Sequence, residues 1–307
     1  MSTGSESGLG TRTEAVGGAL VAFGALCFGS IVVLGKHVLE GGITVYSLLA
    51  MRFGVGAVVL FAFLVALRRP LAAAEGERTG LTVLAVCGYA VEATLFFAAL
   101  RHGTAAAVTL LFFTYPVFVT LMSWVVGRDR PRRLTLAALA CAVAGAVVVV
   151  GTGAGLAIRT AGVVFALGAA VTFSAYLVGA DRVLRLTSPL TSALWVSAGA
   201  SIGLWAFAVL TGNDGLPAGW SEWWPVLGMG VATAAAFVCL LEGVRRIGAV
   251  RTAIVSAMEP LAASVLAVVF LGESVSAGIA LGGGLILVGA VTASLARAAV
   301  TQEPQIP

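Results

Sequence analysis

The sequence has few charged residues and few histidines. Only 10% of its 307 residues are Asp, Glu, Lys or Arg, against roughly 25% in typical soluble domains, and there are two histidines. A chain so poor in charge does not fit a soluble fold. The mean hydropathy of +1.05 and the 60% content of hydrophobic residues instead indicate a protein of the lipid bilayer.

Motifs of several enzyme and cofactor-binding classes are also missing. The sequence has no H-E-x-x-H and no G-x-x-x-x-G-K-[ST], and the glycine-rich run at 151–155 lacks the strand and helix of a dinucleotide site. The four cysteines lie in apolar segments at spacings that fit neither a disulfide framework nor a metal site. We expect no enzyme, no catalytic residues, no cofactor and no metal. Any transport would then be driven by a gradient.

What the chain does contain is a series of apolar segments of about 20 residues, the length at which a helix crosses a bilayer. Lipid favours helices because every backbone polar group is bonded within the segment. We predict an all-α integral membrane protein with ten transmembrane helices. The expected spans are 15–35, 45–67, 81–100, 104–126, 134–150, 161–180, 190–211, 225–244, 249–271 and 277–296.

Arginine is unevenly distributed among the loops. One set of loops is rich in arginine, and the alternate loops carry only Lys36, Arg101 and Arg159. Positive loops resist translocation, so we place both termini in the cytoplasm. Residues 1–14 are expected to form a disordered cytoplasmic N-terminus and residues 298–307 a cytoplasmic tail. Because the basic residues follow topology rather than one helix face, we expect no nucleic-acid partner.

The chain repeats itself weakly at an offset of about 145 residues. Matching positions include Phe28 with Phe173, Gly29 with Ser174 and, to within one residue, Pro116 with Pro260. The expected units are 15–151 and 160–297. Each holds five spans, an odd number, so the second must be inverted relative to the first. Inverted repeats are typical of secondary transporters, with the substrate site near the midplane.

Several motifs resemble one known family. They are Phe28-Gly29-Ser30 with Lys36, Arg52-Phe53, the run Leu111 to Pro116, Arg246 to Ala249, Met258 to Leu261, Leu271 to Ser274, and the glycine-rich last helix. In order and spacing they resemble the EamA family of the drug/metabolite transporter superfamily. The resemblance implies a ten-helix carrier of the inner membrane that exports amino acids, amines or other small metabolites and drugs. One departure is that Arg128 follows Gly127 where Glu273 follows Gly272 in the second unit.

Two carboxyl groups are the first candidates for function. Glu92 lies near the middle of the third span, where an ionised side chain is costly unless it faces water, a cation or a proton. Glu259 directly precedes Pro260, whose ring frees a carbonyl one turn earlier. Each is expected to bind a cationic group or to exchange a proton. The alternatives are a structural salt bridge for Glu92 and a packing kink with a bonded carboxylate for Glu259.

Arg52 lies about 12 Å into the second span, too deep for easy snorkelling. Two interpretations remain open, a structural ion pair with a carboxylate such as Glu92, and a fork that binds a substrate carboxylate. Aromatic and hydroxyl side chains are further candidates for the wall of the site, and two prolines are candidates for helix kinks that shape it. These candidates are Tyr89, Phe112, Tyr115 and Ser256, with kinks at Pro116 and Pro260.

The residues therefore predict a secondary transporter that moves a small zwitterionic or cationic metabolite outward by alternating access, with proton exchange as one mode of coupling. The alternatives are a uniport facilitator, a carrier of sugars or organic anions, and a non-transporting scaffold or receptor subunit. Gly278 and Gly282 form a small-xxx-small pair in the last span that permits close helix contact within one chain or in a homodimer.

Overall fold

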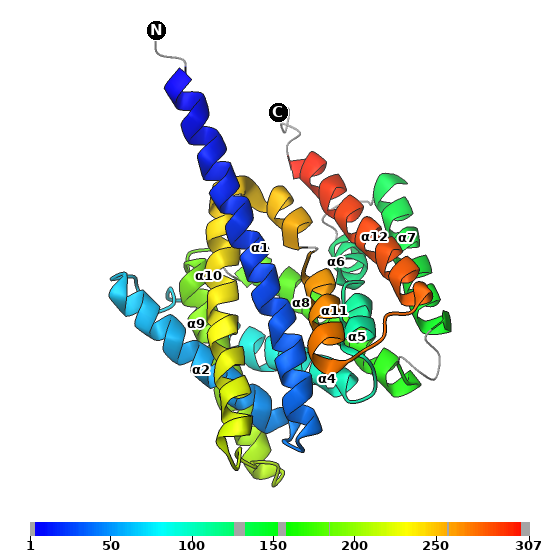
Figure 1. Ribbon diagram of the computed structural model, residues 1–307. Helices are drawn as coiled ribbons and strands as arrows, with labels where there is room; N and C mark the ends of the chain where they lie inside the picture. The colour runs from blue at the N-terminus through cyan, green and yellow to red at the C-terminus, as the bar shows by residue number, and fades with distance from the viewer. Residues whose placement is uncertain (1–3, 126–132, 153–157, 184, 257, 302–307) are drawn as a thin grey trace.

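This computed structural model describes residues 4–125, 133–152, 158–183, 185–256 and 258–301. In these residues all of the regular secondary structure is helical. Figure 1 shows their arrangement, with α1 beginning and α12 ending on the same side of the molecule. The helices are α1 (Gly4–Glu40), α2 (Val45–Ala66), α3 (Arg78–Val83), the π-helix η1 (Leu84–Tyr89), α4 (Ala90–Leu100), α5 (Ala105–Phe112), α6 (Tyr115–Val125), α7 (Arg133–Thr152), α8 (Thr160–Val183), α9 (Pro189–Leu210), α10 (Trp220–Ser256), α11 (Met258–Leu271) and α12 (Ala277–Thr301).

Short polar side chains start several of these helices. The hydroxyls of Thr44, Thr104 and Ser188 each accept a hydrogen bond from a backbone N–H three residues ahead, at the starts of α2, α5 and α9. Such caps satisfy N–H groups that have no partner inside the helix. Pro189 follows Ser188 at the first helical position, where a missing N–H costs nothing. The apolar runs after Thr44 and Ser188 then continue as uninterrupted helices of 22 residues each.

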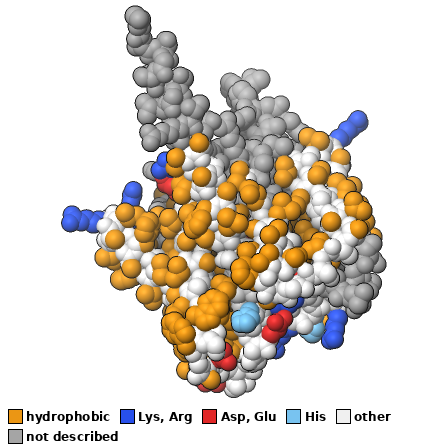
Figure 2. Space-filling view, in the orientation of Figure 1, with side chains coloured by type: hydrophobic (Ala, Val, Ile, Leu, Met, Phe, Trp, Pro, Cys, Tyr) orange, Lys and Arg blue, Asp and Glu red, His pale blue; other side chains and the backbone are white. Residues whose placement is uncertain are grey.

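The helices are long and apolar enough for a membrane protein. Six described helices have the length and composition of a bilayer span, and four shorter apolar helices accompany them. Many of their large hydrophobic side chains point outward, and Figure 2 shows hydrophobic side chains over most of one face with charged ones at its edges. Such a surface is suited to lipid. The predicted all-α membrane fold is confirmed, and ten spans in inverted repeats stay a prediction.

Helices from the two halves of the chain pack against each other in pairs. α1 lies beside α10 and α11, α8 lies beside α4 and α6, α2 pairs with α9, and α7 pairs with α12. Small residues permit the closest of these contacts. A Cβ added at Gly282 of α12 would lie 2.7 Å from the carbonyl oxygen of Gly145 in α7. Gly282 is thus used for packing within the chain.

One helix is interrupted just before a proline. α5 ends at Phe112 and α6 begins at Tyr115, one residue before Pro116. A proline lacks the N–H that would bond four residues back and its ring crowds that carbonyl, so the backbone opens there. In the second half α11 begins at Met258, two residues before Pro260, and residue 257 between α10 and α11 lies outside the described residues. Another irregularity, η1, lies between α3 and α4.

Two boundaries differ from the sequence-based expectation. α1 begins at Gly4, so most of the stretch 1–14, for which disorder was predicted, is helical. The chain has no proline before residue 70, so nothing ends the helix that the first span starts. α10 also continues through 245–248, where a loop was predicted. The loops at 128–132 and 153–157 and the tail after Thr301 lie outside the described residues.

Candidate functional site

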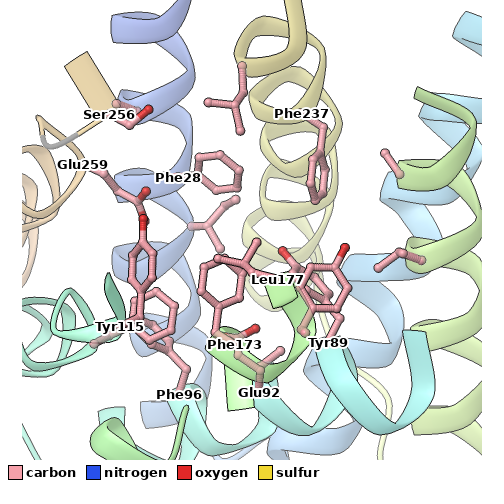
Figure 3. A pocket seen from close by; sticks show the side chains of 18 of the residues that line it. Phe28, Tyr89, Glu92, Phe96, Tyr115, Phe173, Leu177, Phe237, Ser256 and Glu259 are labelled. Carbon is pink, nitrogen blue, oxygen red and sulfur yellow. The ribbon is translucent and has the colours of Figure 1, made fainter. Parts of the chain in front are cut away.

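A cavity of about 560 Å³ lies among helices of both halves of the chain. Its walls come from α1, α2, η1, α4, α5 and α6 of the first half and from α8, α9, α10 and α11 of the second. Figure 3 shows the side chains converging on this space. All seven residues predicted for the site line it, namely Arg52, Tyr89, Glu92, Phe112, Tyr115, Ser256 and Glu259.

The two carboxyl groups enter the cavity from different elements. Glu92 comes from α4 and only 7% of it is exposed, whereas Glu259 comes from the start of α11. Figure 3 shows the Tyr115 ring pointing toward Glu259, with Glu92 farther along the cavity. In the described part of the chain neither carboxyl group forms an ion pair, and no hydrogen bond satisfies Glu92. Carboxyl groups within a membrane that form no ion pair are expensive and mark functional sites.

Arg52 is also buried, with 6% of its surface exposed. Its Nε donates a hydrogen bond of 3.0 Å to Thr233 Oγ1, and its guanidinium carbon lies 4.8 Å from the Phe53 ring centroid and 5.5 Å from that of Phe97. Among the described residues no carboxylate forms an ion pair with it. The structural pair between Arg52 and Glu92, one of the two interpretations of the sequence, is therefore not formed. A hydroxyl and two aromatic rings hold the charge instead.

The cavity walls are mostly aromatic. The Phe112 ring centroid lies 5.2 Å from that of Phe96, 5.3 Å from Phe173 and 5.7 Å from Tyr115. Tyr89 forms a second group with Phe53 and Tyr176, at 5.5 Å and 5.3 Å. Offset and edge contacts of this kind fix ring positions. Such walls suit an amphipathic guest, and ring faces attract a cation.

Several wall residues were not predicted from the sequence. Phe28 and Phe173 line the cavity. Their match at an offset of 145 residues was the available signal, because the predicted inverted repeat would bring such positions to a shared site. No sequence signal identifies Thr233, an isolated hydroxyl in an apolar helix.

The cavity extends toward one end of the helices. Thr187 and Pro189, at the start of α9, line it there. We call this the Arg69 end, because the segments 67–77 and 185–188 meet there and carry Arg69 and Arg185. The opposite end, which we call the Lys36 end, comprises the segments 41–44, 101–104, 211–219 and 272–276. No residue of these segments is among the described residues that line the cavity.

A single carboxylate joins three segments at the Lys36 end. Glu273, which follows α11, forms an ion pair with Lys36 at 2.5 Å and accepts a hydrogen bond from the backbone N–H of Ala105 at 2.8 Å. The Lys36 ammonium also donates to the carbonyl oxygen of Gly103 at 3.0 Å. A carboxylate at a helix N-terminus is favoured by the helix dipole. These contacts close the Lys36 end over α1, α5 and α11.

Another carboxylate organises the Arg69 end. Glu77 accepts hydrogen bonds from the Thr187 hydroxyl at 2.6 Å and from the backbone N–H groups of Arg185, Leu186 and Thr187 at 2.7 to 2.9 Å. The Thr187 hydroxyl and these N–H groups stabilise the charged form and lower the Glu77 pKa from 4.5 to about 2. Nearby, Trp195 Nε1 donates to the carbonyl oxygen of Leu71. The segments before α3 and α9 are thereby held as one unit.

One motif that the sequence analysis overlooked has a structural explanation. Residues 199–203 read G-x-S-x-G, the pattern of a hydrolase nucleophile, which requires a sharp turn between a strand and a helix. Here Ser201 lies inside the regular helix α9, and its hydroxyl donates to the carbonyl oxygen of Ala50 at 2.7 Å. The motif therefore serves the packing of α9 on α2.

Comparison with known proteins identifies the family. The model of the EamA-like transporter family matches residues 15–151 and again residues 160–295. The chain belongs to the EamA-like transporter family. The family and the membrane character predicted from the sequence are therefore confirmed, and the chain is a multi-pass membrane protein of a transporter family.

Curated relatives carry the same general name. An uncharacterized transporter, YwfM, of Bacillus subtilis (strain 168) is 29% identical over 221 residues, which cover 70% of this chain and 73% of the relative. An uncharacterized transporter of Archaeoglobus fulgidus is 27% identical over 284 residues, covering 92% and 97%. A crystal structure that is 24% identical covers 92% of this chain and 98% of its own with a TM-score of 0.65, and shows the shared fold.

Proposed function

We propose that this EamA-family protein is a secondary transporter that exports small amphipathic metabolites bearing an amine, across the cytoplasmic membrane and by alternating access. The observation that carries the proposal is the pair of carboxyl groups, Glu92 and Glu259, that enter one aromatic cavity and form no ion pair in the described chain. An ammonium group of the substrate, or a proton, would supply the missing partner. Proton exchange for substrate would then follow from competition for the same groups.

The shape of the cavity supports alternating access. The cavity reaches the Arg69 end, while Glu273 and Lys36 tie the segments of the Lys36 end together. By the distribution of arginine the Arg69 end is cytoplasmic, so the conformation corresponds to one that loads substrate from inside. The matched helix pairs of the two halves, together with the two family matches, support an inverted repeat that would open the other end.

The experiment compares the metabolites that accumulate in the medium of cells expressing the wild type, or a Glu92→Gln, Glu259→Gln variant at equal membrane abundance, by untargeted mass spectrometry. We expect selective accumulation with the wild type and at least a tenfold smaller excess with the variant, because glutamine neither carries the charge nor exchanges a proton. A Glu222→Gln variant is the matched control, since within the described residues the Glu222 carboxylate accepts its hydrogen bond from the Ala218 N–H of its own segment.

Each result bears on a different part of the proposal. Equal accumulation from wild type and double variant would contradict the assignment of the carboxyl groups and keep the exporter. No difference from cells without the protein would contradict export. Accumulation that persists after the proton gradient is collapsed would contradict proton coupling and favour a facilitator.

A further inference from the structure

Arg52 is a buried cation whose two terminal nitrogens have no acceptor in the described chain. Its Nε donates to Thr233 Oγ1, and no other hydrogen bond or ion pair of the guanidinium is formed there. The residue nevertheless lines the cavity and is 6% exposed. A guanidinium removed from water needs a partner, and its terminal N–H groups match the two oxygens of a carboxylate.

The hydroxyl oxygen of Thr233 acts as the acceptor for the Arg52 Nε–H group. Its hydroxyl proton is already donated to the carbonyl oxygen of Met229, 2.8 Å away on the preceding turn of α10. The oxygen therefore presents a lone pair to Arg52, and Thr233 itself is fully buried. This pair of bonds fixes which edge of the guanidinium faces α10 and which edge remains for the cavity.

Close packing of α2 on α10 puts the short threonine within reach. A Cβ at Gly230 would lie 2.4 Å from Val55 and 3.0 Å from the carbonyl oxygen of Arg52, so any larger residue would push the helices apart. The rings of Phe53 and Phe97 then restrict the guanidinium in the remaining directions. The guanidinium of Arg52 is thus oriented by three side chains, Thr233, Phe53 and Phe97, none of which is acidic, and Glu92 and Glu259 act on its charge only at longer range.

We infer that Arg52 is a carboxylate-binding subsite of the cavity, and that Thr233 is the positioning residue that directs its terminal nitrogens toward the bound molecule. The inference rests on the proposed function, in which this cavity holds the transported molecule. The carboxyl groups of Glu92 and Glu259 provide for a cationic group in the same cavity, so the transported molecule carries both charges and places its carboxylate at Arg52.

The test is ligand-dependent stabilisation of the purified full-length protein. Sodium butanoate and butylammonium chloride serve as probes, each compared with sodium chloride at equal ionic strength, and thermal unfolding is followed by tryptophan fluorescence. A ligand that binds only the folded state raises the unfolding temperature. We expect both probes to stabilise the wild type, and Thr233→Val to lose the butanoate effect while it keeps the butylammonium effect.

Two variants separate positioning from general packing. Thr233→Ser keeps the hydroxyl and should keep the butanoate effect. Thr172→Val removes a hydroxyl that bonds only to the carbonyl oxygen of Gly168 on its own helix, and should also keep it. A variant that is only less stable would unfold at a lower temperature in the absence of ligand. The rise in unfolding temperature that butanoate causes would still be seen in that variant.

The outcomes distinguish this inference from the proposed function. Absence of butanoate stabilisation in the wild type, or its persistence in Thr233→Val, would overturn the subsite at Arg52. If butylammonium alone stabilises the wild type, the cationic site of the proposed function stands without the carboxylate subsite. If butanoate alone does so, the subsite stands and the amine-binding function fails.

Discussion

Glu77 is the side chain that joins the segments before α3 and α9. It accepts three backbone N–H bonds and one hydroxyl bond, all from residues more than 100 positions away in the chain. Replacing Glu77 with Gln places an NH₂ group against donors and removes the charge that they stabilise. We expect Glu77→Gln to lower the unfolding temperature at neutral pH, measured by tryptophan fluorescence.

The pH dependence of this effect follows from the lowered pKa. Because the Glu77 pKa falls from 4.5 to about 2 on folding, its charged form stabilises the protein fully above pH 4.5, and the stabilisation is lost as the pH falls toward 2. The difference between wild type and Glu77→Gln should therefore shrink over that range. A difference that stays constant down to pH 2 would contradict the assignment. Glu75→Gln, in the same loop, is the control.

A residue of the candidate site could be predicted from the sequence where its type is rare in its surroundings. Glu92, Glu259 and Arg52 are charges within apolar spans, which is itself a signal, and all three line one cavity. Their functional roles stay predictions. Glu77 and Glu273 lie in polar loops where a glutamate is unremarkable, and their partners are 108 and 237 residues away. Local sequence holds no information about such distant pairs.

The pairing of α7 with α12 depends on glycine at the contact. A Cβ at Gly282 would meet the carbonyl oxygen of Gly145 at 2.7 Å and the backbone nitrogen of Val149 at 2.9 Å. Backbone atoms cannot move aside, so we expect Gly282→Ala to destabilise the protein by about 1–3 kcal/mol, as overpacking does. Gly284→Ala is the matched control, because nothing lies within 4 Å of a Cβ there.

The measurement is the unfolding temperature of both variants in the same detergent. If Gly282→Ala and Gly284→Ala are equally stable, the close contact of α7 and α12 is wrong. A loss confined to Gly282→Ala would agree with the intramolecular use of this position. From the sequence alone, Gly282 fits packing within one chain and packing between two chains equally well.

Helix boundaries were predictable where a cap or proline marks them, and not elsewhere. The break between α5 and α6 lies next to Pro116, as the missing N–H implies, and α9 starts at the Ser188–Pro189 signal. η1 was not predicted, because its sequence is as apolar as the α-helix on either side. Helix hydrogen bonds that slip by one residue are a result of tertiary packing.

Two residues that match at the offset of 145 residues both make contacts between the two halves of the molecule. Gly29 of α1 packs against Ala262 and Ala263 of α11, and Ser174 of α8 donates a hydrogen bond to the Tyr115 carbonyl oxygen at the start of α6. The Ser174 contact falls beside the break between α5 and α6. The weak matches at an offset of 145 residues thus indicate which positions make contacts between the two halves. Composition and span lengths alone do not indicate these positions.

Glu273 and Glu259 lie at the two ends of α11, one at the Lys36 end and one in the cavity. Opening the Lys36 end requires that Glu273 leave Lys36 and the Ala105 N–H. We expect Glu273→Ala to open this end more often. The test uses a cysteine-free protein that carries Val32→Cys, because Val32 is a buried residue of the cavity wall. A thiol reagent that does not cross the membrane is added on the Lys36 side. It should react with this cysteine roughly tenfold faster, or more, in Glu273→Ala than with Glu273 in place, since about 1.4 kcal/mol shifts a population tenfold.

Glu222→Ala is the control for this experiment, because Glu222 bonds only within its own segment near the same end. It should leave the reaction rate of the cavity cysteine unchanged. Equal rates in wild type and Glu273→Ala would show that the Glu273 contacts do not keep the cavity closed. The measurement needs no knowledge of the transported molecule.

The π-helical turn at Leu84–Tyr89 has a consequence for how the family can vary in length. It packs on α8 and α9, while its last residue, Tyr89, and Glu92 beyond it line the cavity. A π turn contains one more residue than the α turn it replaces. Deleting that residue would restore a regular helix, but would rotate the preceding residues by about 100° relative to the cavity. A homologue without the extra residue must therefore have rebuilt either the cavity wall or the contacts with α8 and α9.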